Sequence, residues 1–266
     1  MIHDPFSEYK AAQRESWALF APLEVFTIQS AGELAEHANV SVGQRVLDVG
    51  CGTGVVAIAA ARRGARVQGL DLSPVLLERA KWNAGVAKVE IDFSEGDVEN
   101  LPFGDCEFDC VVSQFGHMFA PRPDVALGEM LRVLKPGGTI AFATWPGELF
   151  TGRMFSLVAK YAPPPPDVPS PTLWGEPSII RERLGDRVRD LLFDCPLMLT
   201  PVLSVEHVLL NFENTAGPVV KLKQKLEREN PEQLQRFRDE FRELISSFAR
   251  LSSLKQHYLM TRATKV

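Results

Sequence analysis

A glycine-rich turn between two apolar runs constrains the fold of this chain more than any other feature. Residues 46–54 read VLDVGCGTG, and VVAIAAARR follows over residues 55–63. The first run is typical of a buried strand and the second of a buried helix. Closely spaced glycines allow a sharp turn and let backbone N–H groups approach a ligand, and the start of a helix favours negative charge. The turn therefore predicts a nucleotide-type ligand at the edge of an α/β sheet.

The same alternation of strand and helix continues along the first half of the chain. Helices are expected over 8–39, 55–63, 74–84 and 124–134, and strands over 45–49, 66–70, 89–93, 108–113 and 139–145. Strands that alternate with helices of these lengths predict a parallel α/β sheet covered on both faces.

The pattern changes after residue 145. Residues 163–166 read PPPP, which is a stiff extended stretch. A helix is expected over 176–184, a sixth strand over about 187–193, charged helices over 204–250 and a last strand over 257–263. This second half therefore predicts a helical addition placed before the last strand of the sheet.

Composition excludes several classes of function. The net charge of −5 argues against a nucleic-acid partner, because phosphate binding needs clustered Lys and Arg. No apolar run reaches 18 residues and the first 17 residues are polar, so neither membrane insertion nor a signal peptide is expected. The four cysteines have neither zinc nor disulfide spacing. We therefore expect a cytoplasmic protein without a metal site.

A second carboxylate supports the interpretation of the glycine turn. Asp71 lies 71 − 48 = 23 residues after Asp48, at the end of the next expected strand, where a ribose diol is bound in a doubly wound sheet. A dinucleotide fingerprint would need a third glycine at position 55, which is Val55. The spacing is G-x-G-x-G instead, so a different nucleotide is favoured; a purely structural turn is the alternative.

The segment VLDVGCGTG resembles the first motif of the class I S-adenosylmethionine (SAM) methyltransferases. Three later segments strengthen the resemblance: GDVENLPF at 96–103 is similar to the adenine loop of that family, FDCVVS at 108–113 to its fourth strand, and RVLKPGG at 132–138 to the turn before its fifth strand. In style these motifs resemble the ubiquinone and menaquinone C-methyltransferases. Pieces beyond residue 145 also resemble bacterial methyltransferases of the small-molecule type.

The resemblance implies a Rossmann-like, seven-stranded, mostly parallel sheet with helices on both faces, an antiparallel last strand and a helical cap. Residues 1–40 are then N-terminal helices covering the active site, and 41–199 the SAM-binding core. Residues 200–254 form a helical cap insertion, and 255–266 hold the last strand of the sheet.

The resemblance also implies roles for individual residues. Asp48 would orient the glycine loop and the SAM amino group, while Asp71 would hold the ribose hydroxyls, with a helix cap as its alternative role. Asp97 would accept from the adenine amine, with a turn residue as the alternative. The other positions implied to bind the cofactor are Gly50, Cys51, Gly52, Gly54, Leu72, Val98, Ser113 and Gln114.

His117 is the candidate catalytic base, because it follows the fourth strand at the expected edge of the active site. A histidine held structurally in a loop is the equal alternative. Apolar acceptor walls are expected from Phe6, Tyr9, Trp17, Phe115, Met118, Phe119, Trp145 and Trp174.

The expected function is a SAM-dependent methyltransferase that moves a methyl group to a small aromatic or lipophilic acceptor, with S-adenosylhomocysteine as the second product. Two alternatives stay open: an RNA or protein methyltransferase, and a SAM-binding protein without catalysis. The sequence leaves the oligomeric state open.

Overall fold

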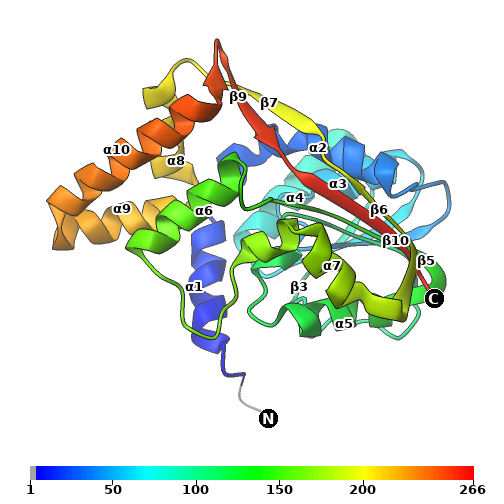
Figure 1. The fold of residues 1–266 in the computed structure, drawn as a ribbon. Helices are drawn as coiled ribbons and strands as arrows, with labels where there is room; N and C mark the ends of the chain where they lie inside the picture. Colours follow the sequence, from blue (N-terminus) through cyan, green and yellow to red (C-terminus); the bar gives the residue numbers. More distant parts are fainter. Residues whose placement is uncertain (1–3) are drawn as a thin grey trace.

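The computed structural model describes residues 4–266 and is built around a seven-stranded sheet (Figure 1). The strand order is β3-β2-β1-β4-β5-β10-β6. All neighbouring pairs from β3 to β5 are parallel, whereas β10 is antiparallel to both β5 and β6. The strands are β1 (Arg45–Val49), β2 (Arg66–Asp71), β3 (Asp92–Glu95), β4 (Phe108–Gln114), β5 (Leu134–Thr144), β6 (Val188–Asp194) and β10 (Leu259–Lys265). The prediction of a Rossmann-like, mostly parallel sheet is confirmed.

Helices pack around this sheet and their ends follow simple backbone rules. They are α2 (Glu24–His37), α3 (Val55–Arg62), α4 (Pro74–Ala87), α5 (Pro123–Val133) and α7 (Pro177–Leu184), whereas α1 (Ser7–Trp17) and α6 (Phe150–Tyr161) pack against the smaller unit described below. Gly64 leaves α3 with φ +86°, and Pro74 opens α4 at a position where its missing N–H costs nothing. Val46, Leu47, Val111, Val112 and Ile140 are completely buried, as expected for parallel strands covered on both faces.

The order of the strands decides where a ligand can bind. The chain moves from β1 to β2 and β3 on one side, and then crosses to β4 and β5 on the other. The loops that leave β1 and β4 therefore diverge, which opens a crevice at the carboxyl ends of these two strands. The glycine turn lies at this edge of the sheet.

A second, smaller unit separates β6 from β10. It holds β7 (Leu197–Pro201), α8 (Val205–Thr215), α9 (Gly217–Glu229), α10 (Pro231–Phe248), β8 (Ala249–Arg250) and β9 (Ser253–His257). The three strands form an antiparallel sheet in the order β7-β9-β8. Figure 1 shows α8, α9 and α10 gathered on the opposite side of the molecule from α5 and α7, with α6 between them and the main sheet. Residues of α6 share a hydrophobic cluster with the three helices, centred on Phe150, Phe237 and Phe241.

Several elements differ from the expectation. β5 begins at Leu134 and not at 139, because Leu134 already pairs with Phe108 of β4, so the expected turn at 135–138 lies within the strand. The third strand begins at Asp92 and not at 89, because Lys88 adopts a left-handed conformation at the end of α4 and residues 89–91 only connect. The sequence did not indicate helix α6. The expected last strand over 257–263 is divided between β9 and β10, with Tyr258 between them. No helix among residues 4–266 has the length and apolarity needed to cross a membrane.

Candidate cofactor and acceptor site

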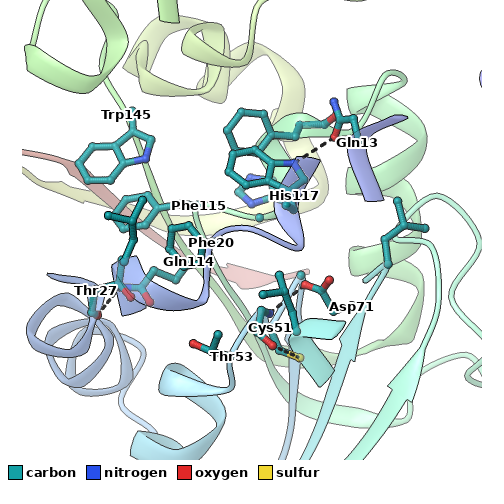
Figure 2. Close-up of a pocket in the computed structure, with 18 of the residues that line it drawn as sticks. Gln13, Phe20, Thr27, Cys51, Thr53, Asp71, Gln114, Phe115, His117 and Trp145 are labelled. Atoms are coloured by element: carbon teal, nitrogen blue, oxygen red, sulfur yellow. Dashed lines mark hydrogen bonds between the residues drawn. The ribbon is translucent and has the colours of Figure 1, made fainter. Parts of the chain in front are cut away.

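A cavity of about 230 Å³ opens at the carboxyl ends of β1, β2 and β4 (Figure 2). One wall comes from the glycine loop, the end of β2 and residues 96–98. The remaining walls come from α1, α2, the segment 114–121 at the end of β4, α6, the end of β5 and the small unit between β6 and β10. Segments from all parts of the chain therefore meet at this single cavity.

The glycine loop needs glycine for two different reasons. Gly50, Gly52 and Gly54 have φ values of +64°, +53° and +80°, which other residues rarely adopt. A side chain on Gly50 would also place its Cβ 2.9 Å from the Cα of Gly116. A Cβ on Gly52 would meet nothing within 4 Å. Glycine is therefore required at position 50 because two backbones pack closely there. At position 52 it is required because of the backbone conformation beside the cavity.

Asp48 is buried behind the loop with half of its carboxylate unused. Its Oδ2 accepts a hydrogen bond of 2.9 Å from the backbone N–H of Ala57. Its Oδ1 is buried and has no partner among residues 4–266. Burial, with a smaller contribution from the charge of Asp71, raises the pKa of Asp48 to about 7. A buried carboxylate oxygen without a donor suits a ligand that carries an ammonium group.

Asp71 helps to shape the start of α4 and also lines the cavity. Its Oδ1 accepts from the N–H of Ser73 at 2.8 Å, which shapes the start of α4, and its Oδ2 accepts from the N–H of Gly52 at 2.8 Å. The side chain also lines the cavity, next to Leu72. Burial raises the pKa of Asp71 even though these backbone hydrogen bonds act to lower it. Each carboxylate oxygen keeps a lone pair for a further donor.

Asp97 and Val98 line the cavity beside a lysine that the sequence analysis missed. Lys10 Nζ lies 2.6 Å from Asp97 Oδ2, 2.5 Å from Glu99 Oε2 and 2.7 Å from Asp4 Oδ2. These three carboxylates are grouped as in a cation site, but the ammonium occupies the place between them. Burial acts to lower the pKa of Lys10, and the three carboxylates reverse this and raise it. A single lysine on a polar helix gives no signal in the sequence.

The end of β4 holds Ser113 and Gln114 in structural hydrogen bonds. The Ser113 hydroxyl is completely buried; it donates to the carbonyl oxygen of Val49 at 2.6 Å and accepts from the N–H of His117 at 3.1 Å. The Gln114 amide donates to the carbonyl oxygen of Thr27 at 3.0 Å. Gln114 lines the cavity and Ser113 does not. Ser113 therefore lies behind the cavity wall and holds the backbone of its neighbours in place.

His117 has the surroundings of a structural histidine. Its ring packs between Phe142 and Trp174, with both ring centroids 4.7 Å away. Neither ring nitrogen has a hydrogen-bond partner within the described part of the chain. Burial, together with the nearby charge of Arg183, lowers the pKa of His117 to about 3. A neutral imidazole of such low basicity favours the structural alternative over the catalytic base.

The structure brings most of the expected cofactor residues to one cavity. Among the eleven residues expected to bind the cofactor, all line it except Gly54, which faces Phe93 and Ala80, and Ser113. Cys51 is buried, and burial followed by the charges of Asp48 and Asp71 raises the pKa of its thiol. This thiol is therefore not a nucleophile at neutral pH.

The remaining wall of the cavity is aromatic and apolar. Phe115 stacks on Trp145 at 3.9 Å between ring centroids and 12° between ring planes, and both lie on the opposite side of Figure 2 from Asp71. Phe115 has a φ of +56°, a strained value for a bulky residue at a functional site. Of the expected acceptor walls, Trp17, Phe115, Phe119 and Trp145 line the cavity, whereas Phe6, Tyr9, Met118 and Trp174 do not. Wall residues that the sequence did not indicate are Phe20, Phe26, Phe155, Phe212, Met154 and Met198.

Comparison with known proteins agrees with this geometry. Residues 47–142 match a protein-family profile described as a methyltransferase domain. An uncharacterized protein of Mycobacterium tuberculosis is 35% identical over 216 residues, which is 79% of each chain. The ubiquinone biosynthesis O-methyltransferase of Escherichia coli is 32% identical over 146 residues, covering 53% of this chain and 61% of the enzyme.

A solved structure shares the fold. The YcgJ protein of Bacillus subtilis superposes with a TM-score of 0.58 at 19% identity, covering 89% of this chain and 98% of that protein. The matched profile spans β1 to β5, where the glycine loop and the carboxylates at the ends of the strands lie. The chain belongs to the class I SAM-dependent methyltransferases.

Proposed function

We propose that this enzyme transfers a methyl group from SAM to a small, uncharged, aromatic or lipophilic acceptor. The observation that carries the proposal is the continuity of one cavity from the glycine loop to the aromatic wall. SAM supplies a methyl group on a sulfonium with a good leaving group, so the protein has to align the two reactants and exclude water. The aromatic wall and the covering helices serve both needs.

The hydrogen-bond acceptors present in the cavity wall fit SAM. Asp48 would accept from the amino group of SAM through its unpartnered Oδ1. Gly50, Cys51 and Gly52 would lie along the methionine part, because a Cβ on Gly52 meets only open space. Asp71 would accept from the ribose hydroxyls through its spare lone pairs.

The adenine side of the cavity is assigned on position. Leu72, Asp97 and Val98 line the cavity together with Asp71, and residues 96–103 resemble the adenine loop of the family. Asp97 would accept from the adenine amine while it keeps its ion pair with Lys10. Gln114 would stand near the sulfonium at the end of β4.

The charge of the cavity supports an uncharged acceptor. Lys10 is the one Lys or Arg among the described residues that line it, and three carboxylates already neutralise its ammonium. A phosphate-bearing acceptor such as RNA would need free cations here. The name of the Escherichia coli relative, an O-methyltransferase of ubiquinone biosynthesis, agrees with an apolar acceptor.

We further propose that residues 1–40 and 200–254 cover the site and select the acceptor. Both segments contribute lining side chains, among them Trp17 and Phe212. We expect the protein to act in the cytoplasm, where SAM is available and its four free cysteines stay reduced.

Two measurements test this proposal. Titration calorimetry with SAM and S-adenosylhomocysteine should show one site per chain, and Asp71→Asn should weaken both affinities. Asp109→Asn changes a carboxylate that lies outside the cavity and should leave them unchanged. Labelled SAM, incubated with the enzyme and a metabolite extract, should then label a compound that partitions into organic solvent. Absence of cofactor binding, or label only in RNA or protein, would contradict the proposal.

A further inference from the structure

Three polar side chains form a linked group in the otherwise apolar wall of the cavity. Thr151 of α6, Thr200 of β7 and Gln256 of β9 all line the cavity and are 7%, 5% and 6% exposed. Thr151 Oγ1 lies 3.1 Å from Gln256 Oε1, and Gln256 Nε2 lies 2.6 Å from Thr200 Oγ1. We call these three residues the polar triad. They come from three separate elements, so the tertiary fold has placed them together.

The polar triad has more hydrogen-bond donors than it uses. Two threonine hydroxyls and one amide group offer four donor hydrogens, and two of them are used within the triad. In the orientation given, Thr200 accepts from the amide and its own O–H is free. If the amide were turned over, Thr151 would accept from it and the O–H of Thr151 would be free instead. Either way, one hydroxyl hydrogen and one amide hydrogen of the triad have no acceptor among residues 4–266 and are left for a ligand.

The position of the triad separates it from the cofactor. Asp71 ends β2, and Gln256 stands just before β10, which pairs with the carboxyl end of β5 through Leu259 and Thr144. From β2 to β10 the sheet order passes β1, β4 and β5. Four strand spacings place the start of β10 about 19 Å across the sheet from the end of β2, and Gln256 lies in β9, shortly before that start. The triad therefore faces the part of the cavity that lies beyond β4, on the side of the aromatic wall.

The surroundings of the triad determine what kind of ligand it can take. Met198 is the register partner of Gln256 in the small sheet, and Met154 lies one turn after Thr151 on α6. Both line the cavity together with Trp145 and Phe155. A free hydroxyl donor among apolar side chains suits an oxygen atom on an uncharged ring, because an ion would lose its hydration there without a counter-charge.

We propose that the polar triad recognises a hydrogen-bond-accepting oxygen of the methyl acceptor, at the end of the acceptor remote from the cofactor. The acceptor is then an aromatic ring system that carries a carbonyl, ether or hydroxyl oxygen in addition to the atom that is methylated. This inference rests on the proposed function and names the substrate class within it.

A matched pair of probes tests the inference without knowledge of the natural acceptor. The probes 2-methoxynaphthalene and 2-ethylnaphthalene have nearly the same shape and differ by one ether oxygen. Their affinities are measured by equilibrium dialysis with the full chain saturated with S-adenosylhomocysteine. Because one hydrogen bond to a neutral group contributes about 0.5–1.5 kcal/mol, the ether should bind about two- to tenfold more tightly.

Substitutions assign this preference to the triad. Thr151→Val with Thr200→Val removes both hydroxyls and keeps the shape, but it leaves the Gln256 amide without partners and able to donate to a ligand. Adding Gln256→Met removes the amide as well, so in this triple variant, which has no unpaired polar group, the ratio of the two affinities should fall to one. Thr27→Val is the control, because Thr27 also lines the cavity but its hydroxyl already donates to the carbonyl oxygen of Glu24.

The outcomes are distinct. A wild-type ratio of one, a preference that survives in the triple variant, or loss of the preference in Thr27→Val would overturn the inference while leaving cofactor binding intact. Failure of both probes to bind the complex with S-adenosylhomocysteine would also overturn it. Failure of S-adenosylhomocysteine itself to bind would contradict the proposed function, and this result is read first.

Discussion

Asp48→Asn should make this protein more stable at alkaline pH and at the same time a weaker binder of its cofactor. Asp48 is 1% exposed, at the centre of the sheet, and burial raises its pKa to about 7. One of its oxygens is held by the N–H of Ala57 and the other has no partner among the described residues. The ionised side chain therefore destabilises the ligand-free protein, and a bound cation would compensate its charge.

The sign of the pH effect follows from proton binding in the two states. The pKa of Asp48 is about 7 in the folded protein, against 3.8 for an ordinary aspartate. The folded state therefore holds the proton more tightly, and stability falls as the pH rises through this window. The loss is complete above about pH 7 and amounts to about 4 kcal/mol, at 1.36 kcal/mol for each pKa unit.

Asparagine removes the charge but introduces an amide donor without a partner, at a cost of about 1–3 kcal/mol. Asp48→Asn should then be more stable than wild type by about 1–3 kcal/mol at pH 8. At pH 4, where the wild-type carboxyl is neutral in the fold, the variant should be less stable by about the same amount. The order of stability reverses between the two values of pH.

Cofactor binding should change in the opposite direction at pH 8. Loss of a charge-assisted hydrogen bond to the ammonium group of SAM costs about 1.5–3 kcal/mol, or about 10- to 100-fold in affinity. Urea unfolding of the free protein at both pH values gives the stability, and calorimetry with S-adenosylhomocysteine gives the affinity.

A control carboxylate separates this effect from a general effect of charge. Asp109 is paired with Lys135 at 2.6 Å, and this hydrogen bond lowers its pKa. Asp109→Asn should therefore be less stable than wild type at neutral pH and equally stable in acid. It should bind the cofactor with the wild-type affinity. An Asp48→Asn protein with the wild-type pH dependence, or with unchanged affinity, would refute the reasoning.

Three further results are expected. Lys10→Met leaves the buried Glu99 carboxylate with Arg122 as its remaining cation, so urea unfolding should show a loss of about 1–3 kcal/mol, and an unchanged midpoint would contradict the bridging role of Lys10. His117→Leu should keep most of the turnover with labelled SAM between pH 6 and 8, because an imidazole whose pKa is about 3 is a weak base. A drop in turnover of about 10²–10⁴-fold would instead show that His117 is the catalytic base. Iodoacetamide at pH 8 should modify the two exposed cysteines and spare Cys51, as read by mass spectrometry of the peptides.

The part of the site that the sequence predicts is the part encoded by neighbouring residues. β1 begins and ends at the expected residues, and the glycine loop and Asp71 lie together at the edge of the sheet, because each of these signals is local. A strand, a turn and a helix are specified by periodicity and by glycine conformation over about 30 residues.

The part that the sequence missed depends on contacts between distant segments. Thr151, Thr200 and Gln256 are ordinary polar residues when each is considered alone, and only the pairing of β7 with β9 against α6 joins them. Lys10 meets residues almost 90 positions away. For His117 the position at the end of β4 was predicted, but the direction of the ring depends on Phe142 and Trp174, which lie far along the chain.

The place of β10 in the main sheet has a consequence for synthesis of the protein. This strand lies between β5 and β6, yet the ribosome makes it after every other strand described here. Until then one edge of β5 is open and β6 has no strand partner, so the nascent chain exposes unpaired backbone groups on both strands. Such edges promote aggregation of incomplete chains. A stop codon placed just before Leu259 should therefore yield insoluble protein, although the glycine loop and the cavity wall of β1, β2 and β4 would all be present.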